Sequence, residues 1–134
     1  MSGEKNLTKL LASLTAKLDP DTYVFATTTS EVPAGLKPRM IFEEAEGTTL
    51  ITTLEQARAH NLAYEYESRM ITLDIHSSLE AVGFMAVIAT RLAARGLSVN
   101  PVSAFYHDHI FVPAERADDA MSELAAIASE AQNA

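Results

Sequence analysis

The chain has 134 residues, of which 48% are apolar and 21% are charged, with a formal net charge of −8 and no cysteine. This profile is that of one ordinary globular domain, or of two very small ones that share a core. The lack of cysteine excludes disulfides, thiolate metal ligands and a cysteine nucleophile, and the acidic balance argues against nucleic acid as a partner, since binding it needs a basic surface.

The N-terminal part is predicted to begin as a helix and to continue as a strand. Leucines between residues 7 and 18 have the spacing of one helical face, and Asp19-Pro20-Asp21 should end this helix. The β-branched and aromatic residues of 22–29 favour a strand. Two prolines and a glycine in residues 30–38 are typical of a loop.

Two short strands, a helix and a long strand are expected next. Residues 39–53 have the pattern of two strands around a turn at Glu46-Gly47. Residues 54–62 then favour a short helix, and residues 64–77 a long strand whose second half is mostly apolar.

The last part of the chain is predicted to contain two helices and a hairpin. Residues 78–96 favour a helix, whose inward face would contain Leu79, Val82, Met85, Ala86, Ala89, Leu92 and Ala93. Residues 97–106 and 109–113 favour two strands. They would be joined by a tight turn at His107-Asp108, because aspartate tolerates the positive φ that such turns need. Residues 114–131 favour a closing helix.

Two predicted strand-to-helix junctions are alike in sequence. Thr53-x-x-Gln56 and Ser77-x-x-Glu80 both have the capping-box pattern, in which the hydroxyl and the side chain three residues later satisfy each other's backbone N–H groups. Either the chain contains an internal duplication or each junction shows the usual chemistry of a strand entering a helix. The residues alone leave both interpretations open.

From residue 64 onward the order of elements is that of a ferredoxin-like (split βαβ) α+β fold. A right-handed crossover would place the carboxyl ends of strands 69–75 and 97–106 at one edge of the sheet. The junction at His76–Ser78 and the turn at His107-Asp108 should therefore be neighbours.

At these positions the sequence resembles an ACT domain. HSSLEAVG (76–83) and YHDHIFVP (106–113) are similar to segments of small bacterial proteins with two tandem ACT-type units, which are related in fold to amino-acid sensors. The resemblance extends from about Glu65 to Ala117. The first 60 residues depart from a full unit, because their predicted order is helix, strand, strand, strand, helix.

The resemblance implies an α+β fold of two tandem ferredoxin-like (ACT-type) βαββα units, with antiparallel sheets and helices on one face. Residues 1–62 would form a partial N-terminal ACT-like unit. Residues 63–134 would form the C-terminal ACT-like unit.

His107 and His109 would face the same side of a strand, which suggests either metal ligands or the flanks of a plain turn. A catalytic metal site usually needs a third protein ligand. Further ligands would have to come from the neighbouring junction: Asp74, His76 and Glu80. The turn is the favoured interpretation, so we expect no metal.

Asp74, His76 and Ser78 are the residue types of a hydrolase triad. Residues two apart on a strand lie roughly 6–7 Å apart, however, with side chains that stand side by side instead of relaying hydrogen bonds. We therefore expect no catalytic residue and no enzyme activity.

Gly83 lies inside the predicted helix, where glycine costs about 1 kcal/mol relative to alanine, so something should approach it closely. That neighbour is either a nearby strand or a second, symmetry-related copy of the chain, or it is a ligand at the helix start. Free backbone N–H groups there suit the α-carboxylate of an amino acid. A ligand ammonium would then face Asp108 or Glu80, and only one of Phe105 and Tyr106 should be buried.

Together with the resemblance, these residues predict a non-catalytic regulatory protein that binds an amino acid between Ser77–Gly83 and Phe105–Asp108. The expected ligand-binding residues are His76, Ser77, Ser78, Leu79, Glu80, Gly83, Phe105, Tyr106 and Asp108. The alternative is a protein-interaction or dimerisation module without a small-molecule ligand.

Neither a cationic leader nor an apolar stretch of bilayer length is visible in the sequence, which predicts a cytoplasmic protein without membrane contact. Pro101 within a strand pattern indicates an edge strand, where two sheets could pair. We therefore expect a homodimer with a small-molecule ligand and an unidentified protein partner, but no nucleic acid and no cofactor.

Overall fold

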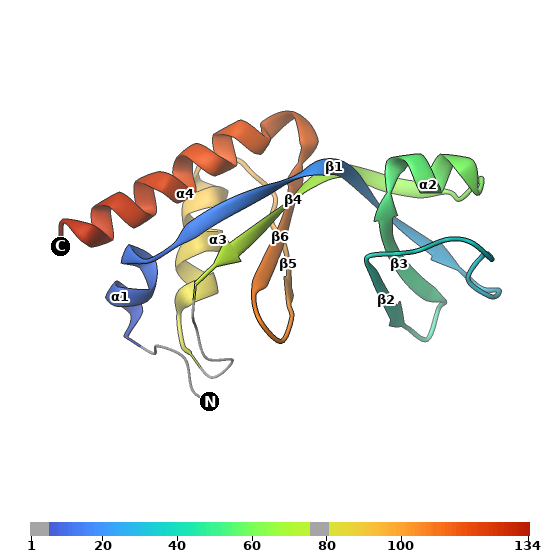
Figure 1. Cartoon of the computed structure of the whole chain (residues 1–134), viewed down its shortest axis with the longest axis horizontal. Coiled ribbons are helices and arrows are strands. Elements are labelled where there is room, and N and C mark those ends of the chain that lie inside the picture. Colours follow the sequence, from blue (N-terminus) through green and yellow to red (C-terminus); the bar gives the residue numbers. More distant parts are fainter. Residues whose placement is uncertain (1–5, 76–80) are drawn as a thin grey trace. The chain divides into compact units, whose positions relative to one another are not determined.

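The computed structural model describes residues 6–75 and 81–134. The elements are, in chain order, α1 (Leu7–Ala12), β1 (Thr15–Thr28), β2 (Met40–Glu43), β3 (Thr48–Thr53), α2 (Leu54–Ala59), β4 (Tyr64–Asp74), α3 (Phe84–Ala94), β5 (Asn100–Ser103), β6 (Asp108–Pro113), the 3-10 turn η1 (Ala114–Arg116) and α4 (Ala117–Gln132). The strands follow the order β2-β3-β1-β4-β6-β5 (Figure 1). None of the helices in these residues is long and apolar enough to cross a membrane.

The chain divides into two compact units, Met1–Asp19 with Met70–Ala134 (unit 1) and Pro20–Arg69 (unit 2). Both boundaries fall inside strands, so β1 and β4 each belong to both units. The strand order is β5-β6-β4-β1 in unit 1 and β2-β3-β1-β4 in unit 2. Each is a ferredoxin-like order. β4 is the first strand of unit 1 and the fourth of unit 2, whereas β1 is the first strand of unit 2 and the fourth of unit 1. The α+β ferredoxin-like expectation is confirmed.

Unit 1 packs its three helices against one face of its strands (Figure 1). Ile71 and Leu73, two residues apart on β4, point to this face together with Ile110 and Val112 of β6. The helices contribute further buried apolar side chains, which include Leu10 of α1, Phe84, Ile88 and Leu92 of α3, and Leu124 and Ile127 of α4. The antiparallel hairpin of β5 and β6 completes the unit.

Helix α3 buries Leu92, as predicted, but the rest of its buried face differs from the predicted one. Phe84, Ile88 and Leu92 are 3%, 0% and 0% exposed, whereas Val82 is 86% exposed and lies before the helix. The buried residues recur every four positions, which is one helical turn. The predicted face was based on a longer helix that includes Leu79, whereas the described helix begins at Phe84.

The N-terminal helix is shorter than predicted. α1 ends at Ala12, where the hydroxyl of Ser13 donates a hydrogen bond to the carbonyl of Leu10 at 2.9 Å. The backbone N–H of Ser13 also bonds the carbonyl of Lys9 at 3.1 Å. Both bonds satisfy carbonyl groups that the end of the helix would otherwise leave without partners.

The segment after α1 is a strand where a helix was expected. Leu14, Ala16 and Leu18 alternate along the chain and pack on the core of unit 1. Pro20, predicted to help end a helix, lies within β1. β1 pairs with β3 only from Tyr23 onward. Pro20 has no backbone N–H group, but at its position no hydrogen bond to β3 is needed.

Unit 2 is built around the antiparallel pairs of β3. Thr53 of β3 lies opposite Tyr23 of β1, and Ile51 of β3 lies opposite Met40 of β2. Between β1 and β2, where unit 1 has α3, residues 29–39 form a loop in the fully described stretch Pro20–Arg69. Leu36 of this loop packs with other apolar side chains of the small core, which are Ala26, Val32, Leu50, Leu62 and Tyr64.

Candidate functional site

The β5–β6 hairpin carries two exposed aromatic side chains at its tip. Ser103 pairs with Asp108, and the N–H of Ala104 bonds the carbonyl of His107 at 3.0 Å. Phe105 and Tyr106 are 80% and 78% exposed, with ring centroids 4.9 Å apart in an edge-to-face contact. The predictions of a turn at His107-Asp108 and of one buried aromatic residue are therefore wrong. β5 ends at Ser103 and not at Tyr106 as predicted, so both rings fall in the loop and escape strand alternation.

Asp108 is the first residue of β6 and closes the base of the hairpin. Its carboxylate accepts a hydrogen bond from the hydroxyl of Ser103, opposite it in the ladder. The side chain is half-buried. A ligand ammonium at this position would share the carboxylate with that hydroxyl.

The other half of the predicted site is only partly described. His76, Ser77, Ser78, Leu79 and Glu80 lie outside the described residues. Gly83 is the N-cap of α3 with φ 93° and ψ −11°, a left-handed conformation. A Cβ atom at this position would lie 3.5 Å from Cδ2 of Leu7, an ordinary contact. The backbone conformation, and not a close neighbour inside a helix, therefore explains this glycine.

Gly83→Ala is expected to lower the free energy of unfolding by about 1 kcal/mol, because an alanine is strained at positive φ. Urea unfolding of the two proteins would measure the difference. Thr90→Ala, at an exposed position of α3, is the control and should stay within about 0.5 kcal/mol of the original protein. Equal stability of Gly83→Ala and the original protein would contradict the assignment.

A row of polar side chains follows β4 and β6 in unit 1. Nδ1 of His107 lies 3.9 Å from Oδ1 of Asp74, and Nδ1 of His109 lies 3.0 Å from the hydroxyl of Thr72. The two imidazole rings are 6.3 Å apart. The end of β4 is thus beside the hairpin, as the predicted topology requires. Within residues 6–75 and 81–134, no three His, Cys, Asp or Glu side chains are grouped to hold a metal ion.

Asp74 also forms an ion pair with Lys17 of β1, with Nζ 2.7 Å from Oδ2. The hydrogen bond from Lys17 holds the pKa of the Asp74 carboxyl below its ordinary value; desolvation opposes this, and the charges of Lys17 and His107 add to it. Because the pKa is lower in the folded state, the pair contributes stability above the unfolded-state pKa. That stability is lost as the pH falls through the folded pKa.

Lys17→Gln is expected to raise the pKa of Asp74 toward its ordinary value and to remove this part of the acid sensitivity. Carboxyl NMR titration would follow the pKa, and urea unfolding over roughly pH 2 to 7 would follow the stability. Lys9→Gln, on α1, is the matched control. An unchanged Asp74 titration in Lys17→Gln would contradict the role of the ion pair.

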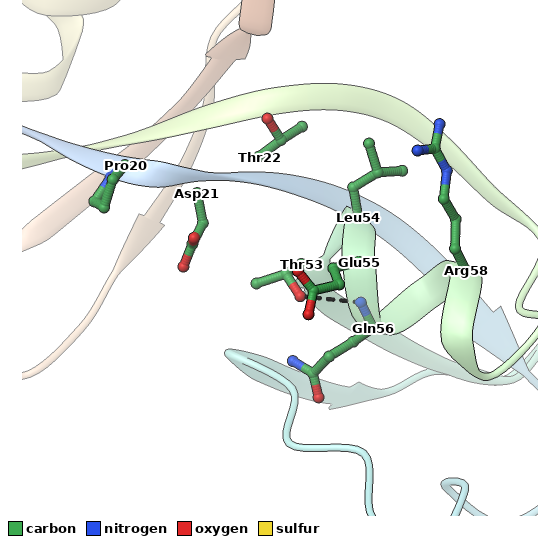
Figure 2. A pocket seen from close by; sticks show the side chains of 8 residues that line it. All are labelled: Pro20, Asp21, Thr22, Thr53, Leu54, Glu55, Gln56 and Arg58. Atoms are coloured by element: carbon green, nitrogen blue, oxygen red, sulfur yellow. Dashed lines mark hydrogen bonds between the residues drawn. The ribbon is translucent and has the colours of Figure 1, made fainter.

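Unit 2 contains two adjoining hollows on its surface. The larger, of about 650 Å³, lies between the start of the unit's β1 segment and α2 (Figure 2), and the smaller, of about 360 Å³, extends to the loop before β2. They share Asp21, Thr53 and Gln56 as lining residues. Thr53 ends β3 and caps α2 by accepting a hydrogen bond from the N–H of Gln56 at 3.2 Å.

The capping box predicted at this junction is only half formed. Thr53 caps the helix, but the side chain of Gln56 bonds the backbone of Lys37, accepting from its N–H at 2.8 Å and donating to its carbonyl at 3.1 Å. Gln56 therefore attaches the loop to α2. The sequence analysis identified Thr53 and Gln56 as junction residues but did not predict the hollows. Residue spacing along the chain does not show that Gln56 binds a loop residue.

The wall of the smaller hollow contains an ordered arginine. Nη2 of Arg39 donates a hydrogen bond to the hydroxyl of Tyr23 at 2.7 Å, and the guanidinium carbon lies 5.5 Å from the centre of the Tyr23 ring. The backbone N–H of Arg39 bonds the carbonyl of Ile51 at 2.7 Å. The hollow thus has a cationic side whose backbone and side chain are both held in place.

Two family models, both described as ACT domain, match the chain. One matches residues 2–69 and the other residues 65–126. The resemblance seen in the sequence is confirmed, and the match over residues 2–69 extends it to the N-terminal half.

Solved structures share the fold. A Vibrio cholerae protein of unknown function, described as a possible transport protein, is 40% identical with a TM-score of 0.85, over 92% of this chain and 97% of that chain. A protein from Agrobacterium tumefaciens is 14% identical with a TM-score of 0.74, over 86% and 89%. The ligand-free regulatory subunit of aspartate kinase from Thermus thermophilus is 13% identical with a TM-score of 0.59, over 86% and 98%. No curated protein matches the sequence.

Proposed function

Because this chain belongs to the ACT-domain family, we propose that it is a non-catalytic regulatory protein whose ligand is an amino acid. The observation that carries the proposal is the pair of ACT-domain matches, which together extend from residue 2 to residue 126. The fold shared with the regulatory subunit of an aspartate kinase supports a regulatory role. Under this proposal the protein acts on an unidentified partner in the cytoplasm, where a chain without cysteine is well suited.

The proposed amino-acid site lies between Ser77–Gly83 and Phe105–Asp108. The contact of Asp74 with His107 supports this location, because it brings the described end of β4 beside the hairpin. The exposed rings of Phe105 and Tyr106 offer apolar surface to a ligand side chain. Asp108 would supply the negative charge for a ligand ammonium.

A thermal-unfolding screen against the common amino acids tests this proposal. A ligand present at about 100 times its dissociation constant should stabilise the protein by about 2.7 kcal/mol. The stabilisation should be reduced in Asp108→Asn, which keeps an acceptor for Ser103, and in Tyr106→Ala. Glu115→Gln, at an exposed position of the turn before α4, is the control and should respond like the original protein. If no amino acid raises the unfolding temperature, or if both site variants respond fully, the proposal fails.

The second candidate function is a dimerisation module, and the exposed edge strand β2 favours it. β2 is a terminal strand of the sheet order, and its Ile41 and Phe42 are 52% and 61% exposed. The edge predicted from Pro101 is the other terminal strand, β5, as expected. Proline leaves β5 without one backbone donor, so β2 is better suited to pair with a second copy.

Sedimentation velocity over a range of protein concentrations tests this second candidate. Phe42→Lys should shift the protein toward the monomer, because a charge at the edge opposes pairing. Val82→Ser, which also removes an exposed apolar side chain but lies in unit 1, should leave self-association unchanged. Equal effects of the two variants would contradict pairing through β2.

A further inference from the structure

The edge strand β2 of unit 2 offers backbone hydrogen-bonding groups to a further strand. Glu44 and Gly47 exchange N–H to carbonyl hydrogen bonds of 2.9 and 3.3 Å at the turn after β2. In an antiparallel ladder, hydrogen-bonded pairs alternate with pairs that do not bond each other. The register therefore turns the backbone groups of Phe42 toward β3 and those of Ile41 and Glu43 toward the free edge.

The side chains at this edge are apolar in the strand and acidic toward the turn. Ile41 and Phe42 are 52% and 61% exposed. Glu43 ends β2, and Glu44 and Glu46 lie in the turn to β3; all three are exposed. Within residues 6–75 and 81–134, none of these three carboxylates forms an ion pair.

The backbone of β2 accepts a second copy as well as another protein, and charge distinguishes the two. A second copy would bring the same three carboxylates to the interface, and Arg39, the basic residue just before β2, is already bonded to Tyr23. A segment with both basic and apolar residues would neutralise the carboxylates and cover the exposed apolar side chains. In strand addition the backbone bonds give affinity and the neighbouring side chains give specificity. The carboxylates also oppose pairing with acidic segments.

We propose that β2 and the turn 44–47 bind an extended segment of a partner protein, which adds to the sheet of unit 2 as an antiparallel strand. Basic residues at the start of the segment would lie beside the turn, and the apolar residues after them would lie beside Ile41 and Phe42. The proposal rests on the proposed regulatory function, because it assigns the surface through which that function would reach its partner. A second copy at β2 would occupy the same backbone groups and exclude the segment.

Amide chemical-shift titration of the full-length, isotope-labelled protein with the end-capped peptide Lys-Arg-Lys-Val-Ile-Val-Thr tests this surface. One control peptide has glutamate in place of each basic residue. The other has proline in place of the adjacent valine and isoleucine, so that one lost N–H faces β2 in either register. The basic peptide should move the amides of residues 40–47, and added salt should weaken its binding. Each control peptide should bind at least about fivefold more weakly.

A double variant, Glu43→Gln with Glu46→Gln, tests the role of the carboxylates. Glu44 is left unchanged because it also accepts a hydrogen bond from the hydroxyl of Thr49. The double variant should weaken binding of the basic peptide by about fivefold. Glu115→Gln, at an exposed position in unit 1, is the matched control and should bind as the original protein does.

The proposal is overturned if the amides of 40–47 do not move, if either control peptide binds as well as the basic one, or if the double variant binds normally. A dimer that Phe42→Lys dissociates but the basic peptide does not would also overturn it, because a second copy is then the occupant of β2. These failures leave the amino-acid screen unaffected. A protein that binds the basic peptide but responds to no amino acid would refute the proposed ligand and support this surface.

Discussion

Replacing Ile88 with alanine is expected to lower the free energy of unfolding by about 2–5 kcal/mol, the range for removing a large buried aliphatic side chain. Ile88 is 0% exposed at the centre of the buried face of α3, between Phe84 and Leu92. The buried core to which it belongs draws on three helices and two strands of unit 1, so we expect that the cavity cannot close by the movement of one element. Urea unfolding followed by circular dichroism would measure the loss.

Met85→Ala is the matched control for this prediction. Met85 lies on the face of α3 that the sequence pattern assigned to the core, but it is only partly buried. Its truncation should cost less than half as much as Ile88→Ala, since less apolar surface returns to water. A larger loss in Met85→Ala than in Ile88→Ala would show that the face assignment is wrong.

Thr52→Val is expected to raise the free energy of unfolding by about 1 kcal/mol, because it removes a buried hydroxyl without a partner and keeps nearly the same shape. Thr52 of β3 is 0% exposed, and its Oγ1 has no hydrogen-bond partner among the residues that the structure describes. A buried polar group in this state is a net loss relative to its hydrated form. The same urea titration, at neutral pH, would measure the gain.

Ser68→Ala is expected to change stability in the opposite direction. Ser68 of β4 is also 0% exposed, but its hydroxyl donates a hydrogen bond to the carbonyl of Tyr23 at 3.0 Å. Removing it should cost about 1 kcal/mol and leave the carbonyl with one partner fewer. If Thr52→Val lowers stability as Ser68→Ala does, the hydroxyl of Thr52 has a partner in solution.

Elements whose type is decided by a few neighbouring residues could be predicted from the sequence. The prolines and glycine of residues 30–38 predict the loop that the structure shows, because these residues restrict the backbone locally. The turn between β2 and β3 was found for the same reason. The ferredoxin-like order followed from the order of elements after residue 64, whereas the ACT family came from the resemblance of residues 76–83 and 106–113 to that family. Both are confirmed.

Elements decided by distant parts of the chain were predicted less well. Leu14 and Leu18 fit a helical spacing and, with Ala16, a strand alternation. The strand prevails because their partners in the core lie in unit 1 beyond residue 70. Gln56 could not be matched to Lys37, because 19 residues separate them.

The candidate site in unit 1 shows the same limit. The neighbourhood of the β4 end and the hairpin was predicted correctly from topology, as the Asp74–His107 contact shows. The exposure of both Phe105 and Tyr106 was not predicted, because it depends on where the pairing of β5 with β6 ends. The contribution of His76–Glu80 lies outside the described residues and stays a prediction.

The division of β1 and β4 between the units has a consequence for how the protein forms during synthesis. Unit 2 is one continuous stretch, Pro20–Arg69, and can pair its strands as soon as that stretch leaves the ribosome. Unit 1 joins the first residues of the chain to the last; the side chain of Gln132 donates a hydrogen bond to the carbonyl of Ala12 at 2.9 Å. Its contacts have a high sequence separation, which slows folding. Unit 2 should therefore fold first, and α1 can pack against α4 only after α4 has been synthesised.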